Sequence, residues 1–168
     1  MISEIEKQEL ENIYDSLLND ERVKRMQKYE IHRGSNCYIH SFRVAKTAIR
    51  RSLKKKNIDL KVLLYACVLH DYYLYSRKHD EGRKKGHARK HPYVAIENAR
   101  KDFNISNEVA EAIECHMWPF NFKKYPKTKE AKMLCHIDNV IAFKEFLQCK
   151  KYKHKNKDRY NQIIAKLF

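Results

Sequence analysis

The most hydrophobic stretch of the chain reads LKVLLYACVLHDYYLY, residues 60–75. Apolar side chains and one histidine recur there at helical spacing and share a face: Leu63, Ala66, Cys67, His70 and Leu74. The stretch therefore predicts a buried helix, and Asn57 or Asp59 can open it. On this interpretation His70 and its neighbour Asp71 lie deep in the most apolar helix of the protein.

The composition favours an all-α fold. Hydrophobic residues make up 43% of the chain, which is enough for a core, while 3 Gly and 3 Pro provide few of the turns that an all-β fold needs. A length of 168 residues is close to that of one ordinary domain, so we expect a single domain over residues 1–168.

Helical periodicity continues on both sides of residues 60–75. We expect helices over residues 3–18, 21–31, 37–55, 91–103 and 107–116, a long helix from residue 128 to about residue 147, and a short last helix near residues 160–168. Ser3 and Glu6 resemble a capping box, and Pro92 suits a first helical turn. The polar stretches 76–90 and 120–127 are predicted loops, and a basic stretch, residues 148–159, precedes the last helix.

Cysteine usage and hydropathy indicate a cytoplasmic protein that does not enter a membrane. The chain has no apolar run of bilayer length, and its first residues are charged and amphipathic where a secretory signal would be apolar. The cysteines are odd in number and scattered, which suits reduced thiols rather than disulfides: Cys37, Cys67, Cys115, Cys135 and Cys149.

The formal net charge of +15 indicates affinity for phosphate-bearing ligands without choosing among them. A nucleic-acid-binding protein is one alternative. It is not favoured, because the sequence has no zinc finger, RNP motif or clustered basic helix apart from the lysine-rich residues 150–157.

Histidines and aspartates fall near the apolar sides of five predicted helices. The set is His40, His70, Asp71, His91, His116 and Asp138. A buried carboxylate costs on the order of several kcal/mol unless it is paired or bound to a cation, so two of them among histidines suggest a metal site. Imidazole and carboxylate ligands together suit Fe, Mn, Zn or Co better than Ca or Mg. Because neighbours on a helix point about 100° apart, Asp71 could bridge to a second ion, and a site for one or two ions follows.

Any single histidine on an apolar face is more often a core residue than a ligand, so the ordered set carries the argument. His136 should point away from Asp138. Four other residues are expected at the surface or in packing roles: His32, His79, His154 and Trp118.

The same residues resemble the HD-domain superfamily of metal-dependent phosphohydrolases, whose pattern is a His, then His-Asp, then a distant Asp on separate helices. Here these are His40 in IHSFRVAKTA, His70-Asp71 in CVLHDYYLY and Asp138 in CHIDNVIAF, and the resemblance covers residues 37–147. The additional His91 in HPYVAIENA and His116 in IECHMWPF make the order similar to bacterial hydrolases of symmetrical diadenosine tetraphosphate. It is also similar to uncharacterised bacterial HD proteins with HxxxHPYxAxENA and HMWP segments.

The resemblance implies an HD-type helical bundle and metal-activated hydrolysis of a phosphate ester or anhydride, in a nucleotide or another small phosphorylated metabolite. His70 and Asp71 would be catalytic, the six-residue set would hold the metal, and His87 would be a ligand or a phosphate contact. Basic residues on the 76–90 loop are candidate substrate contacts without support from the resemblance: Arg83, Lys84, Lys85 and Arg89. A non-catalytic HD scaffold that binds a nucleotide or a partner protein is a further alternative.

Overall fold

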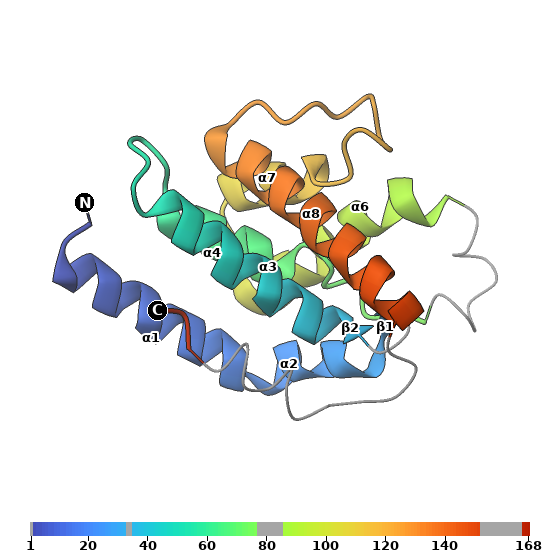
Figure 1. Ribbon diagram of the computed structural model, residues 1–168, viewed down its shortest axis with the longest axis horizontal. Coiled ribbons are helices and arrows are strands. Elements are labelled where there is room, and N and C mark those ends of the chain that lie inside the picture. Colours follow the sequence, from blue (N-terminus) through green and yellow to red (C-terminus); the bar gives the residue numbers. More distant parts are fainter. Residues whose placement is uncertain (1, 33–34, 77–85, 152–165) are drawn as a thin grey trace.

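The computed structural model is an all-α bundle with one small two-stranded sheet (Figure 1), and it describes residues 2–32, 35–76, 86–151 and 166–168. The elements in chain order are α1 (Glu4–Asn19), α2 (Glu21–Lys24), the 3-10 helix η1 (Arg25–Lys28), β1 (Glu30–His32), β2 (Ser35–Asn36), α3 (Cys37–Ser52), α4 (Leu60–Leu69), α6 (His87–Phe103), α7 (Asn107–Cys115) and α8 (Lys129–Lys151). The predicted fold class is confirmed.

Helices α3 and α4 pack along each other in the middle of the bundle. Helix α3 also packs along α8, and α4 also contacts α7 and α8. The core contains many fully buried aromatic and aliphatic side chains, and the ring of Phe42 on α3 meets the ring of Tyr14 on α1 edge to face at 5.3 Å. None of the helices in the described ranges has both the length and the apolar character that a bilayer span requires.

Helix starts follow the predicted caps. The Ser3 hydroxyl accepts from the backbone N–H of Glu6, and the Glu6 carboxylate accepts in return from the backbone N–H of Ser3. Asp59 also caps α4 as predicted, accepting from the backbone N–H of Lys61 and Val62, and the Ser106 side chain accepts from the backbone N–H of Val109 at the start of α7. These polar side chains stabilise the first turns where the backbone N–H groups lack partners within the helix.

The helix predicted over residues 21–31 is wrong beyond Lys28. Residues Glu30–His32 instead pair antiparallel with Ser35–Asn36. The backbone N–H of Cys37 donates to the carbonyl of Tyr29 at 2.9 Å, so the hairpin leads directly into α3. Hydrogen bonds within this hairpin replace the predicted helical ones here.

Two further boundaries differ from the sequence prediction. Helix α4 ends at Leu69, and Leu74 adopts a positive φ of 50°, which a continuing helix does not allow. Helix α6 begins at His87 after Gly86, whose φ is 76°, so Pro92 lies inside the helix and not in its first turn. The predicted 76–90 loop is therefore shorter at its end, and its residues 77–85 lie outside the described part of the chain.

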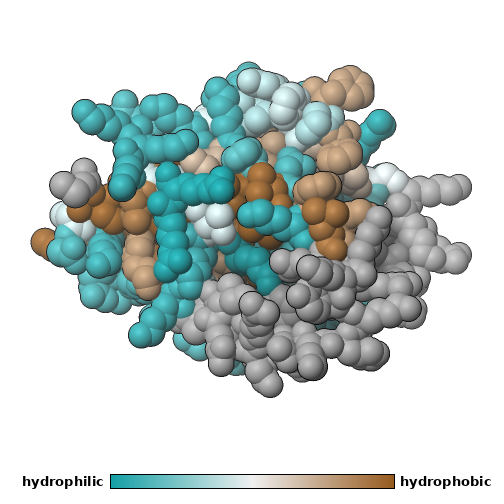
Figure 2. All heavy atoms as spheres, viewed as in Figure 1, coloured by the Kyte–Doolittle hydropathy of each residue, from teal (hydrophilic) through white to brown (hydrophobic). Residues whose placement is uncertain are grey.

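The C-terminal residues pack against the bundle. Leu167 is fully buried, and its carbonyl accepts from the Arg50 side chain at 3.1 Å. The predicted last helix is not present over residues 166–168, and its remainder lies outside the described residues. The face drawn in Figure 2 is mostly hydrophilic with small separated apolar patches.

Candidate metal centre

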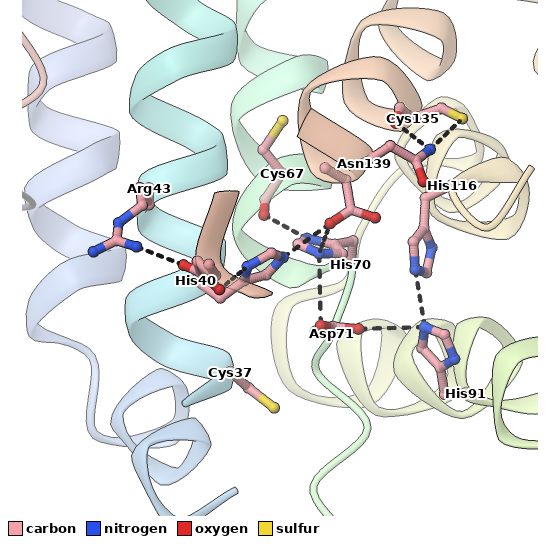
Figure 3. A network of polar contacts seen from close by, with 12 residues as sticks. Cys37, His40, Arg43, Cys67, His70, Asp71, His91, His116, Cys135 and Asn139 are labelled. Carbon is pink, nitrogen blue, oxygen red and sulfur yellow. Dashed lines mark hydrogen bonds and ion pairs between the residues drawn. The ribbon is translucent and has the colours of Figure 1, made fainter. Parts of the chain in front are cut away.

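The six predicted ligand side chains converge in the interior of the bundle. Figure 3 shows five of them directed toward one another: His40, His70, Asp71, His91 and His116. His40 projects from α3, His91 from α6 and Asp138 from α8, while His70, Asp71 and His116 stand at or just beyond helix ends. All six are buried, and the two aspartates are the most exposed at 9% each. Segments far apart in sequence thus supply one polar cluster inside an apolar core.

The helix end explains the placement of the HD pair. His70 caps the C-terminus of α4, and Asp71 lies in the turn that follows, so the two residues are not inside the helix as predicted. The side chain of Asn98 on α6 donates to the carbonyl of Tyr72 at 3.0 Å. This contact holds the turn against α6 directly after Asp71.

One half of the cluster centres on Asp138. Its Oδ1 lies 2.9 Å from Nε2 of His40 and 3.6 Å from Nε2 of His70. Nε2 of His70 also lies 3.7 Å from Oδ2 of Asp71. These atoms surround one small volume.

The other half centres on the second oxygen of Asp71. Oδ1 of Asp71 lies 3.3 Å from Nε2 of His91, which in turn lies 2.9 Å from Nε2 of His116. The two carboxylate oxygens of Asp71 therefore face the two halves of the cluster. Three overlapping groups of potential ligand atoms, each within 4.8 Å, cover all six residues.

Backbone carbonyls orient three of the four histidines. Nδ1 of His70 donates to the Cys67 carbonyl at 2.8 Å, and Nδ1 of His116 donates to the Ile113 carbonyl at 2.7 Å. Nδ1 of His91 likewise donates to the carbonyl of His87 at 2.9 Å. Because a neutral imidazole carries its proton on one nitrogen, these contacts turn the Nε2 lone pairs toward the centre.

That arrangement fits a bound transition-metal ion. The buried Nε2 of His70 has no hydrogen-bond partner among the described residues, and the Nε2 atoms of His91 and His116 face each other with no donor between two neutral rings. Two ligand atoms that each lie about 2.1 Å from one ion, with a ligand–ion–ligand angle of about 90°, are about 3.0 Å apart. This separation is close to the distances between ligand atoms in the cluster. Imidazole and carboxylate donors suit Fe, Mn, Zn or Co.

The two aspartates of the cluster are ionised at neutral pH. Burial opposes the charge of Asp138, but the hydrogen bond from His40 and the nearby imidazole of His70 outweigh it and lower the pKa of its carboxyl. Burial likewise opposes the charge of Asp71, yet the neighbouring His70 and His91 hold the pKa of that carboxyl well below its usual range. Both aspartates are therefore available as anionic ligands.

The histidines differ in protonation. Burial disfavours an imidazolium at His40, but its contacts with Asp138 and Glu145 raise its pKa well above the usual value. In contrast, burial together with the charges of His91 and His70 lowers the pKa of His116 to about 3. At neutral pH His40 is therefore protonated and His116 is neutral.

His87 lies beside the cluster and not within it. Its Nδ1 lies 2.7 Å from the Tyr75 hydroxyl, and its ring stacks on that of His91 with centroids 4.5 Å apart. Arg89 is exposed on the first turns of α6, while the other three basic candidates, Arg83, Lys84 and Lys85, lie outside the described residues.

The remaining histidines and Trp118 mostly stand as expected where they are described. His136 is exposed on α8. Trp118 meets Tyr125 edge to face at 5.5 Å, and its carbonyl accepts from Asn139. The side chain of His32 and the whole of His79 and His154 lie outside the described part of the chain.

Sequence reasoning missed Glu145, which contacts the cluster, and Arg43, which contacts Glu145. Glu145 on α8 is buried, its Oε2 accepts from Nδ1 of His40 at 3.0 Å, and its Oε1 accepts from Arg43 at 2.7 Å. Glu145 follows Asp138 by two helical turns, and Arg43 follows His40 by one. The sequence pattern that could have identified them is this spacing, which places each residue on the same helix face as a candidate ligand.

Comparison with known proteins agrees with this geometry. A family model described as HD domain matches residues 37–142, a range that contains all six cluster residues. No curated protein and no solved structure matches the chain.

Proposed function

Because the chain belongs to the HD domain family, a family of metal-dependent phosphohydrolases, we propose that it hydrolyses a phosphate ester or anhydride in a nucleotide or another small phosphorylated metabolite. The observation that carries the proposal is the position of Asp71. One of its carboxylate oxygens lies near His70, and the other lies near His91. That is the arrangement expected of a carboxylate bridging two metal ions.

The six cluster residues divide into two ligand sets. His40, His70, Asp71 and Asp138 would hold the first ion. Asp71 would bridge to a second ion held by His91 and His116. A bound divalent ion would supply positive charge next to the phosphoryl group and a water of lowered pKa at neutral pH.

The chain's own groups prepare that chemistry. The lowered pKa values of Asp71 and Asp138 keep both carboxylates anionic, and Nδ1 hydrogen bonds fix the rings of His70, His91 and His116. Rigid ligands reduce the reorganisation that a reaction requires. The apolar surroundings strengthen each electrostatic interaction within the site.

Substrate phosphates would approach from the start of α6. Arg89 is exposed there, two residues before His91, and His87 stacks on the same ring. We assign His87, Arg83, Lys84, Lys85 and Arg89 to phosphate binding as part of the proposal. Arginine suits this task because its planar fork of donors matches phosphate oxygens.

The test measures metal content and hydrolysis in the purified protein. Wild type loaded with Co²⁺ or Mn²⁺ is expected to hydrolyse a generic phosphoester such as p-nitrophenyl phosphate, and a panel of nucleotides and sugar phosphates then ranks substrates. Asp71→Ala should lose activity, while His136→Ala, an exposed histidine on α8, should keep it. Equal activity in wild type and Asp71→Ala would overturn the proposal.

A metal-loaded protein without turnover of any phosphorylated compound would favour a non-catalytic scaffold instead. Filter binding as a function of salt separates the nucleic-acid alternative. Binding that survives physiological salt would support it, because non-specific charge attraction falls steeply as salt rises.

A further inference from the structure

Glu145 is a buried carboxylate that the proposed chemistry does not use. It lies on α8, is 3% exposed and contacts two residues of α3. Its Oε2 accepts from Nδ1 of His40 at 3.0 Å, and its Oε1 accepts from Nη1 of Arg43 at 2.7 Å. His40 and Arg43 project from neighbouring turns of α3 (Figure 3).

The contact sets His40 apart from the other histidines of the cluster. The Nδ1 atoms of His70, His91 and His116 donate to neutral backbone carbonyls, each three or four residues earlier in the chain. Nδ1 of His40 instead meets a carboxylate that is distant in sequence. A carboxylate is the stronger acceptor, so it fixes the ring more firmly and makes the opposite nitrogen a better electron donor.

Arg43 makes a carboxylate tolerable at this depth. A buried carboxylate without a partner is costly, because it loses its hydration. The guanidinium of Arg43 lies 2.7 Å from one oxygen of Glu145 and leaves the other oxygen directed at His40. The result is a three-residue chain from Arg43 through Glu145 to His40.

The opposite nitrogen of His40 faces the cluster. Nε2 lies 2.9 Å from Oδ1 of Asp138, an oxygen that also approaches His70. The two ring nitrogens of His40 thus join Glu145 to the half of the cluster that contains Asp138. Any rotation of the His40 ring would therefore move Nε2 away from Asp138.

We propose that Glu145, held by Arg43, is a positioning residue that fixes His40 for metal binding through Nε2 and strengthens binding at the His40–Asp138 half of the centre. The inference rests on the proposed metal centre. It concerns how tightly the His40–Asp138 half binds its ion and not whether the metal site exists.

A purely structural role makes different predictions. Glu145 and Asp138 both contact His40 and so join α8 to α3, and loss of either contact would lower stability. A helix tie would reduce the melting temperature without a selective change in metal affinity. A positioning role weakens one metal-binding event and leaves the other.

Cobalt titration distinguishes the two roles. Co²⁺ is added to metal-free wild type, Glu145→Ala and Glu145→Gln, and binding is followed by calorimetry and by visible absorption, which reports the ligand field. We expect Glu145→Ala to bind the ion of the His40–Asp138 half about 10- to 100-fold more weakly, the usual effect of removing a hydrogen-bond partner of a metal ligand. Glu145→Gln should lose less, because its amide oxygen still accepts from Nδ1.

Glu130→Gln is the matched control. Glu130 lies on the same helix, and its Oε1 accepts from the backbone N–H of Asp59 at 2.7 Å, so it joins α8 to the start of α4 outside the cluster. Its variant should keep both cobalt affinities and the visible spectrum. Glu145→Gln preserves the size of the side chain and decides the question where Glu145→Ala does not fold.

The outcomes separate the two proposals. If wild type binds no Co²⁺, the metal centre fails and this inference fails with it. If wild type binds Co²⁺ and both Glu145 variants match its affinities and spectrum, only the positioning role is overturned. The same conclusion follows if Glu130→Gln weakens binding as much as the Glu145 variants.

Discussion

The Nε2 atoms of His91 and His116 lie 2.9 Å apart in the interior of the protein. Both rings also donate from Nδ1 to backbone carbonyls, so two neutral rings would present facing lone pairs. A metal ion bound beside both rings would accept the two lone pairs.

His116→Ala should reduce the bound metal to one ion per chain. The substitution removes a candidate ligand beside His91, while the contacts of Asp138 with His40 and His70 do not involve His116. We expect two ions in wild type and one in the variant, measured by elemental analysis after equilibration with Co²⁺. Two tightly bound ions in the variant would refute the division of the cluster into two halves.

The stability of the metal-free protein should fall in acid partly through His116. Burial and the charges of His91 and His70 lower its pKa from 6.5 to about 3. Between these values the unfolded chain binds more protons at this site than the folded chain, so the free energy of unfolding falls as pH falls. Urea denaturation in a chelator should show a steeper fall for wild type than for His116→Gln. If the free energy of unfolding falls equally with pH in the two proteins, His116 does not contribute to the acid sensitivity.

The helices that carry the cluster could largely be predicted from sequence. On α3 and α8 the apolar residues recur at helical spacing, and His40 and Asp138 continue the buried stripe. Four of the six candidate ligands, His40, His70, Asp71 and Asp138, also match the family pattern, which is why their convergence could be predicted from the sequence.

Contacts between distant segments could not be predicted. Asn98 holds the carbonyl of Tyr72, and this bond depends on α6 packing beside the turn after α4. In the sequence, Glu145 is one of several charged residues on a long helix. Its contact with His40 follows only from the packing of α8 against α3. Local periodicity has no information on either contact, because both depend on tertiary packing.

Asn98→Ala should loosen the turn that carries Asp71. The variant removes the side-chain donor to the Tyr72 carbonyl, at a cost of about 1–2 kcal/mol for a buried acceptor left without its partner. We expect lower stability and weaker metal binding together, measured by urea denaturation and cobalt titration. Glu97→Ala, an exposed neighbour on α6, is the control and should change neither. Unchanged cobalt affinity in Asn98→Ala would show that the turn holds Asp71 without this bond.

Metal replacement should follow the donor set. Four imidazoles and two carboxylates favour Fe, Mn, Zn or Co over Mg and Ca, which prefer all-oxygen shells. After removal of metal by a chelator, Co²⁺ or Zn²⁺ should raise the melting temperature, because a ligand that binds only the folded state stabilises it. Calcium at equal concentration should have a smaller effect. An equal rise with Ca²⁺ would indicate that the imidazoles do not coordinate the ion.

Arg89→Ala should raise KM and leave kcat nearly unchanged. Arg89 is exposed at the start of α6, so it would attract a substrate phosphate before reaction and add little at the transition state. Exposed charge pairs are worth about 0.2–1 kcal/mol, which corresponds to an increase in KM of about 1.4- to 5-fold. Lys101→Ala, an exposed charge near the other end of α6, should leave KM unchanged. Because salt screens exposed charges, the difference between wild type and Arg89→Ala should shrink as ionic strength rises. A fall in kcat with constant KM would instead place Arg89 in contact with the reacting phosphoryl group.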